Sequence, residues 1–125
     1  MVMYYIEHPN YSSDETELDR ASYYGDKKKV KELIKRGAPV SEWALYHASY
    51  YGYTDIVRML IDYGAPVDEN ALYWASMNGY IEILQMLIDY HTFTIKEIKN
   101  IMKICNNEIK HILHRHLSMR MMEVL

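Results

Sequence analysis

The chain has 125 residues, of which 50% are hydrophobic and 25% are charged, with five glycines and three prolines. This composition predicts a folded protein with one modest core, and it excludes a disordered chain. The formal net charge of -3 leaves neither half basic enough to indicate a nucleic-acid partner.

The start of the chain and its single cysteine indicate the compartment. Cys105 cannot form an internal disulfide, and the first ten residues lack the basic patch and apolar stretch of a signal peptide. The most apolar stretch of about 20 residues, 71–90, contains Glu82 and Asp89, which argues against a membrane span. We therefore expect a soluble, cytoplasmic protein with no membrane partner.

Three blocks of the sequence align without a gap. They are LDRASYYGDKKKVKELIKRGAPV, LYHASYYGYTDIVRMLIDYGAPV and LYWASMNGYIEILQMLIDYHTFT, in which equivalent residues recur every 27 positions. Periods of about 20–50 residues are typical of solenoids and other repeat proteins. The sequence therefore predicts a single repeat domain, with repeats at 14–40, 41–67 and 68–93.

Each block predicts two short helices. An Ala-Ser pair, which allows close helix packing, precedes a glycine that ends the first helix. The second helix carries an apolar stripe at i, i+3 and i+4, as at Val57, Leu60 and Ile61. Asp55 and Glu82 fall in the first turn of this helix, where a negative charge suits the helix dipole.

Turn residues punctuate the helices at repeated places. Gly37 and Gly64 are placed for left-handed C-caps, and a proline two residues later keeps each helix from resuming. Ser41 and Asp68 are placed to cap the next first helix. Helices this short cannot bury their apolar stripe alone, so each unit must be covered by the next, as in a stacked solenoid.

The runs ASYYGYTDIV from Ala48 and ASMNGYIEIL from Ala75 resemble the core of the ankyrin repeat. The resemblance covers about residues 14–91 and implies an all-α, ankyrin-like solenoid of stacked helix-turn-helix repeats. The usual ankyrin repeat has about 33 residues, so the 27-residue period implies a solenoid lacking long β-hairpin fingers. The short repeat is also similar in style to ankyrin proteins of large DNA viruses of amoebae, which implies a host-cell target.

Both ends of the chain are expected to cap the stack. Residues 1–13 are interpreted as an N-terminal cap or vestigial helix, with Met3 and Ile6 in register with the second-helix stripe. Residues 94–125 are interpreted as a degenerate capping repeat followed by a tail from Ser118, which either docks on the cap or stays loose. Two apolar stripes support the capping helices, namely Ile95, Ile98, Ile101 and Met102, and then Ile109, Ile112 and Leu113.

The sequence contains no catalytic constellation. It has no Gly-rich phosphate loop, no Gly-x-Ser-x-Gly elbow and no pair of carboxylates at a repeated special position. The run Lys27–Lys29 is better explained as a solvated helix face than as a contact with an acidic partner or nucleic acid. Glu15 and Glu17, nearby, suit the start of a helix. We predict that the protein is not an enzyme.

Potential zinc ligands gather near the C-terminus, at Cys105, His111, His114 and His116. Strong zinc motifs hold their ligands in turn-supported pairs, whereas these residues fall on a predicted helix, and His116 points away from His114. A polar helix face beside a partly buried thiol is the favoured interpretation. We therefore predict no metal site and no other cofactor.

Tyrosine is the unusual feature of the composition, because 13 of the 16 aromatic residues are Tyr. The ankyrin resemblance implies that the ends of the first helices face the groove commonly used for partners. The candidate protein-binding residues there are Tyr23, Tyr24, Tyr50, Tyr51, Met77 and Asn78. Earlier on the same helices, on or beside that surface, lie Tyr46, His47, Tyr73 and Trp74.

Two explanations of these aromatic residues remain open. Tyr and Trp give large contact area at little entropic cost, which favours a binding surface. They would equally form a ladder that stabilises a solenoid deprived of its hairpins. The predicted function is a protein-interaction module, acting as an adaptor or inhibitor. The alternative is a self-associating structural subunit, in which the Tyr surface or the Met-rich tail pairs with a second copy as a homodimer.

Overall fold

The computed structural model describes residues 15–124, and over this range the chain forms eight helices and no strand. The predicted N-terminal cap at residues 1–13, with Met3 and Ile6, lies outside the described residues. The helices are α2 (Glu17–Tyr24), α3 (Lys27–Lys35), α4 (Glu42–Tyr51), α5 (Thr54–Tyr63), α6 (Glu69–Met77), α7 (Ile81–Tyr90), α8 (Ile95–Met102) and α9 (Asn107–Val124).

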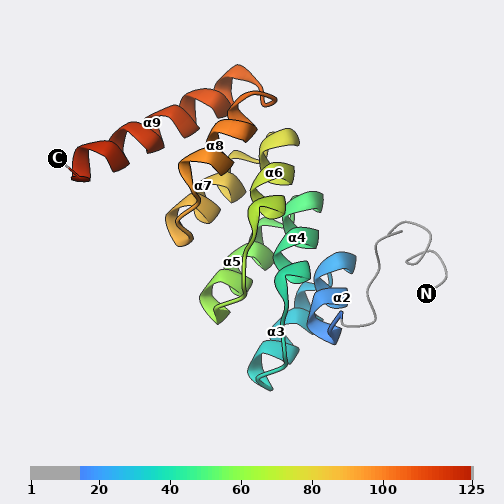
Figure 1. Ribbon diagram of the computed structural model, residues 1–125. Coiled ribbons are helices and arrows are strands. Elements are labelled where there is room, and N and C mark those ends of the chain that lie inside the picture. Colours follow the sequence, from blue (N-terminus) through green and yellow to red (C-terminus); the bar gives the residue numbers. More distant parts are fainter. Residues whose placement is uncertain (1–14, 125) are drawn as a thin grey trace.

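The helices stack in consecutive pairs, as Figure 1 shows. The first helices α2, α4, α6 and α8 contact one another in order, and the second helices α3, α5 and α7 form a parallel row. We call these the first-helix row and the second-helix row. This arrangement confirms the predicted all-α solenoid, because each pair packs only against its neighbours.

The helix ends form where the sequence predicts them. The side chains of Ser41 and Asp68 accept hydrogen bonds from the backbone N–H groups of Trp43 (3.2 Å) and Asn70 (3.0 Å). Gly64 ends α5 with φ of 89°, a left-handed conformation that suits glycine. The turns that follow α3 and α5 are short, so no hairpin finger projects from the described part of the stack.

Small residues bring the first helices close together. Ala48 and Ala75 are both fully buried, and so are Leu45 and Leu72 one turn earlier on α4 and α6. The second-helix stripe is buried at its first two members, with Val57 and Leu60 inaccessible to solvent, while Ile61 is partly buried. The core therefore runs the length of the stack as one continuous cluster.

A hydrogen bond between neighbouring repeats recurs along the stack. The hydroxyl of Tyr63 donates to the backbone oxygen of Ala38 (2.6 Å), and the hydroxyl of Tyr90 donates to that of Ala65 (2.9 Å). Both acceptors lie in the loop after the second helix of the preceding repeat. These bonds fix the spacing of consecutive repeats. The sequence pattern alone did not predict this role for Tyr63 or Tyr90.

The second-helix row is joined by ion pairs. Lys27 contacts Asp55 at 2.8 Å, and Arg58 contacts Glu82 at 2.8 Å, each pair linking two repeats. The basic run at the start of α3 is therefore more than a solvated face, because Lys27 is paired across the repeat boundary. Over the described range, no helix is long and apolar enough to cross a membrane.

The two predicted C-terminal capping helices form as α8 and α9. Ile98 and Ile101 of α8 are buried, but Ile95, the first residue of the helix, is 48% exposed. The predicted stripe therefore loses its first member. The tail from Ser118 is not loose: it continues α9, which extends beyond the stack in Figure 1. Arg120 on this helix donates to the backbone oxygen of Phe93 (2.7 Å).

Candidate functional site

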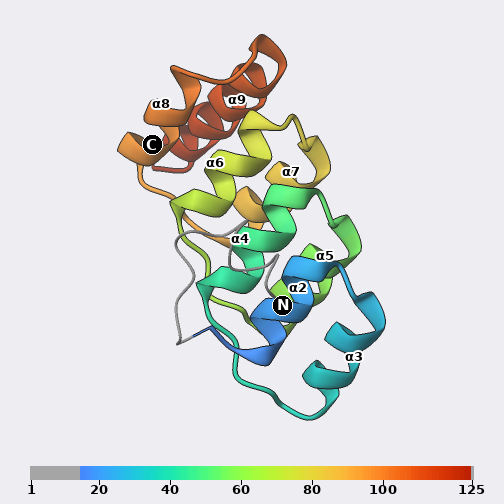
Figure 2. The ribbon, with the colours of Figure 1, turned by 90° about the vertical axis from the view of Figure 1, so that its right-hand side faces the viewer.

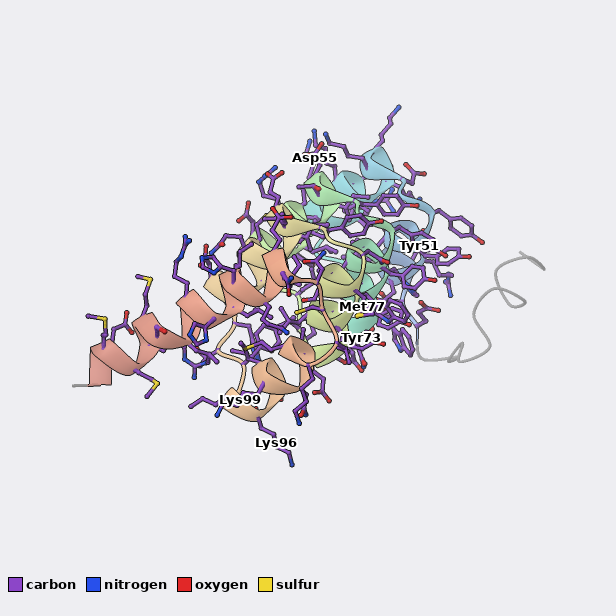
Figure 3. All side chains as sticks on the ribbon, turned by 90° about the horizontal axis from the view of Figure 1, so that it is seen from above. Tyr51, Asp55, Tyr73, Met77, Lys96 and Lys99 are labelled. Carbon is purple, nitrogen blue, oxygen red and sulfur yellow. The ribbon has the colours of Figure 1, made fainter. Side chains whose placement is uncertain are left out.

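The first-helix row presents a surface of aromatic and amphipathic side chains. Figure 3 shows Tyr51, Met77 and Tyr73 along one side of the stack, while Asp55 lies on another. Tyr24 and Met77 are largely exposed, at 52% and 41%. We define the aromatic face by the members of the predicted set that reach the surface, namely Tyr24, Tyr46, Tyr50, Tyr51, Tyr73, Trp74, Met77 and Asn78.

The rings of the aromatic face contact one another across repeats. The ring centroids of Tyr50 and Trp74 lie 4.7 Å apart at an interplanar angle of 66°, an edge-to-face contact between α4 and α6. Asn78 adds a hydrogen bond from its side-chain amide to the backbone oxygen of Tyr50 (3.0 Å). These contacts between neighbouring helices hold the rings of the aromatic face in one arrangement in the absence of a partner.

Two residues of the predicted binding set belong beneath the face, not on it. Tyr23 is 5% exposed and His47 is 1% exposed. The Tyr23 ring is enclosed by edge contacts with Tyr24, His47 and Tyr51, at centroid distances of 4.8–5.4 Å. These two side chains consequently support the surface and cannot contact a partner directly.

The burial of His47 depends on a residue that sequence reasoning placed differently. Glu15 was expected to serve the start of a helix, yet its side chain is buried and its Oε1 lies within hydrogen-bond distance of His47 Nε2. Trp43 stacks on the imidazole, at a centroid distance of 5.7 Å. A buried carboxylate needs such a partner, because desolvation of an unpaired charge is costly.

A shallow hollow of about 270 Å³ continues the aromatic face between α6 and α8. Tyr73 forms one wall. The remaining lining residues are Glu69, Asn70, Glu97, Asn100, Ile101 and Ile104. Sequence reasoning missed the α8 side of this hollow, because α8 lies outside the three well-aligned blocks.

Acidic residues supply the charge of α4 and α6, the two central helices of the aromatic face. Burial is the main reason that the pKa of Tyr46 is raised, with Tyr50 and Asp68 adding to the effect and a hydrogen bond from Trp74 opposing it. Asp68 caps α6, and Glu42 and Glu69 open α4 and α6. Neither α4 nor α6 contains a lysine or arginine.

The potential zinc ligands near the C-terminus do not come together in one site. Across residues 15–124, no three His, Cys, Asp or Glu side chains come together as a metal site would require. Burial raises the pKa of the Cys105 thiol, which makes it less reactive. Burial, with the neighbouring Arg120, lowers the pKa of His116.

A second cleft, of about 680 Å³, lies between α7 and α9 and away from the aromatic face. It carries charges of both signs, from Asp89 and Glu123 on one hand and Arg115 and Arg120 on the other. Such a mixture favours no single class of ligand, so the aromatic face remains the candidate site.

Comparison with known proteins agrees with the geometry of the stack. A family model described as ankyrin repeats, in three copies, matches residues 18–99. That range runs from the first turn of α2 into α8 and covers well over half of the chain. A search of curated proteins gives no match. The chain therefore belongs to the ankyrin-repeat family.

Proposed function

We propose that this chain is a cytoplasmic adaptor or inhibitor that binds a host-cell protein through the aromatic face. Ankyrin repeats are in general protein–protein interaction modules and typically do not catalyse reactions. The observation that carries the proposal is the partly exposed pair of Tyr50 and Trp74 at the junction of the two central repeats. The host-cell target follows from the likeness of the short repeats to those of viral ankyrin proteins.

The chemistry of the face suits an interface. Tyr and Trp bury large areas at small entropic cost and keep a polar tip, so they dominate binding energy when they lie centrally. The contact between Tyr50 and Trp74 and the bond from Asn78 hold the rings in one arrangement. Less conformational freedom is then lost on binding.

The test is capture of partners from host cytosol by the immobilised chain, followed by titration of the recovered protein. Tyr50→Ala combined with Trp74→Ala should weaken that binding strongly, since individual hot spots contribute ~2 kcal/mol or more. Asp62→Ala with Lys35→Ala, exposed on α5 and α3, provides a matched control and should bind like the parent. Full-strength binding by the aromatic double variant would rule out the face.

Self-association is the second candidate, and the exposed methionines of α9 favour it. Met119, Met121 and Met122 are 60%, 64% and 74% exposed near the C-terminal end of α9. Large exposed apolar side chains commonly mark contact surfaces. Light scattering over a dilution series should show a dimer that Met119→Glu with Met122→Glu abolishes. A monomer at every concentration would exclude this role.

A further inference from the structure

We infer that the segment bound by the aromatic face is a cationic, arginine-rich stretch of a protein. The inference rests on the proposed function, because it specifies the partner of the same surface. It is carried by the charge distribution around the face, by the hollow between α6 and α8, and by the aromatic rings themselves.

The charged residues of α4 and α6, the two central helices of the aromatic face, are all of one sign. Glu42 is the only Asp, Glu, Lys or Arg residue in α4, and Glu69 is the only one in α6, with Asp68 immediately before it. Figure 2 shows α2, α4 and α6 side by side, with their N-terminal ends along one edge of the row. Glu42 and Glu69 lie one turn before Tyr46 and Tyr73, so with Asp68 they form an acidic border along the N-terminal edge of the aromatic face.

These carboxylates differ from those on the second-helix row. There, Asp55 and Glu82 are paired with Lys27 and Arg58. Among the described residues, by contrast, no lysine or arginine lies within ion-pair distance of the acidic border. The border thus keeps its charge available for a partner.

The hollow between α6 and α8 adds further carboxylate and amide groups next to the aromatic face. Glu69 and Glu97 line it together with Asn100, and Tyr73 stands beside them. One carboxylate oxygen of Glu97 accepts the backbone N–H of Thr94 at 2.9 Å, which leaves its second oxygen as an acceptor. In Figure 3, Lys96 and Lys99 leave α8 on sides away from Tyr73.

Arginine fits this combination better than lysine does. Its planar guanidinium stacks on Tyr and Trp rings and donates several hydrogen bonds to carboxylates and amides at once. The aromatic face supplies Tyr50, Tyr73 and Trp74, and the border supplies Glu42 and Glu69. An extended segment with repeated arginines would meet both kinds of group along the row.

The experiment measures fluorescence anisotropy of a labelled peptide of alternating arginine and serine with the intact chain at physiological salt. Matched peptides carry lysine or glutamate in place of arginine. The arginine peptide should bind most tightly, the lysine peptide more weakly, and the glutamate peptide not at all. Glu42→Gln with Glu69→Gln should weaken the arginine peptide by about tenfold, as expected for the loss of two charge-assisted contacts.

The control removes the same net charge elsewhere. Asp62→Asn with Asp89→Asn, exposed on α5 and α7, should change the affinity by less than about twofold, because distant surface charges are screened at this salt concentration. Circular dichroism confirms that each variant is folded. If both double variants lose affinity for the arginine peptide equally, the effect is one of net charge and the inference is wrong. The inference is also wrong if the arginine peptide does not bind the parent chain.

The two proposals fail in different ways. In one outcome, the parent chain captures a cytosolic protein, the Tyr50→Ala, Trp74→Ala variant does not, and the arginine peptide fails to bind. The proposed interaction function then stands, and the inference of a cationic partner is wrong. If neither the protein nor the peptide depends on these rings, the face itself is wrong.

Discussion

The ring of Tyr80 lies directly against the α-carbon of Gly52. A Cβ atom built on Gly52 would come within 2.8 Å of that ring, and the backbone there has φ of 77°. The same relationship joins Tyr53 to Gly25, where the distance would be 2.7 Å. The tyrosine at the start of each of these second helices thus covers the end of the preceding repeat's first helix, which couples the repeats.

We therefore predict that Gly52→Ala destabilises the protein more than Gly79→Ala does. Gly79 has a similar φ of 74° but nothing within 4 Å of its built Cβ, so it isolates the backbone cost. That cost is ~1–2 kcal/mol, and overpacking against the Tyr80 ring should add ~1–3 kcal/mol. Urea denaturation monitored by circular dichroism measures both. Equal losses would show that the ring moves aside freely.

The recurrent bond between repeats gives a second prediction. Tyr90→Phe removes the hydroxyl that donates to the backbone oxygen of Ala65, a fully buried residue. The change should lower the free energy of unfolding by ~1 kcal/mol. Tyr73→Phe is the matched control, because the Tyr73 side chain is partly exposed at the wall of the hollow between α6 and α8 and should tolerate the change. A Tyr90→Phe variant as stable as the parent would mean that water replaces the bond.

The C-terminal pair is predicted to act as a cap. Removing residues 92–125 would expose the stripe of Leu84, Leu87 and Ile88, each at most 4% exposed in the whole chain. The shortened chain should aggregate, as measured by size-exclusion chromatography with light scattering. A monomeric, cooperatively unfolding product would show instead that α8 and α9 are an appendage.

The pair of Lys27 and Asp55 predicts a pH effect. The hydrogen bond and charge of Lys27, with smaller contributions from Arg58 and Lys31, lower the pKa of Asp55 from its ordinary value. A carboxyl pKa lowered by folding contributes stability that is complete above the ordinary pKa and is lost as the pH falls through the lowered one.

Lys27→Met should accordingly raise the pKa of Asp55 toward its ordinary value in an NMR titration. Lys28→Met, the exposed neighbour, should leave that pKa where it is in the parent. The stability of the Lys27→Met variant should also fall less steeply on acidification. An unchanged Asp55 titration would mean that the ion pair does not persist in solution.

The sequence by itself determined the repeat, the helix pairs and their ends. These features depend on local chemistry: Ser41 and Asp68 cap helices through their own side chains, and Gly64 tolerates a left-handed backbone wherever the chain places it. The 27-residue period then required stacking, because neither helix of a pair can bury its apolar stripe alone.

Only the tertiary structure decided which aromatic side chains face solvent. Tyr23 and Tyr24 are adjacent in one motif, yet one is buried and the other exposed, because burial depends on what the neighbouring repeat places over each ring. His47 and Trp74 occupy equivalent positions, but Glu15 covers only His47. The bonds from Tyr63 and Tyr90 likewise join residues 25 positions apart, at a distance fixed by packing between repeats and invisible in any local pattern.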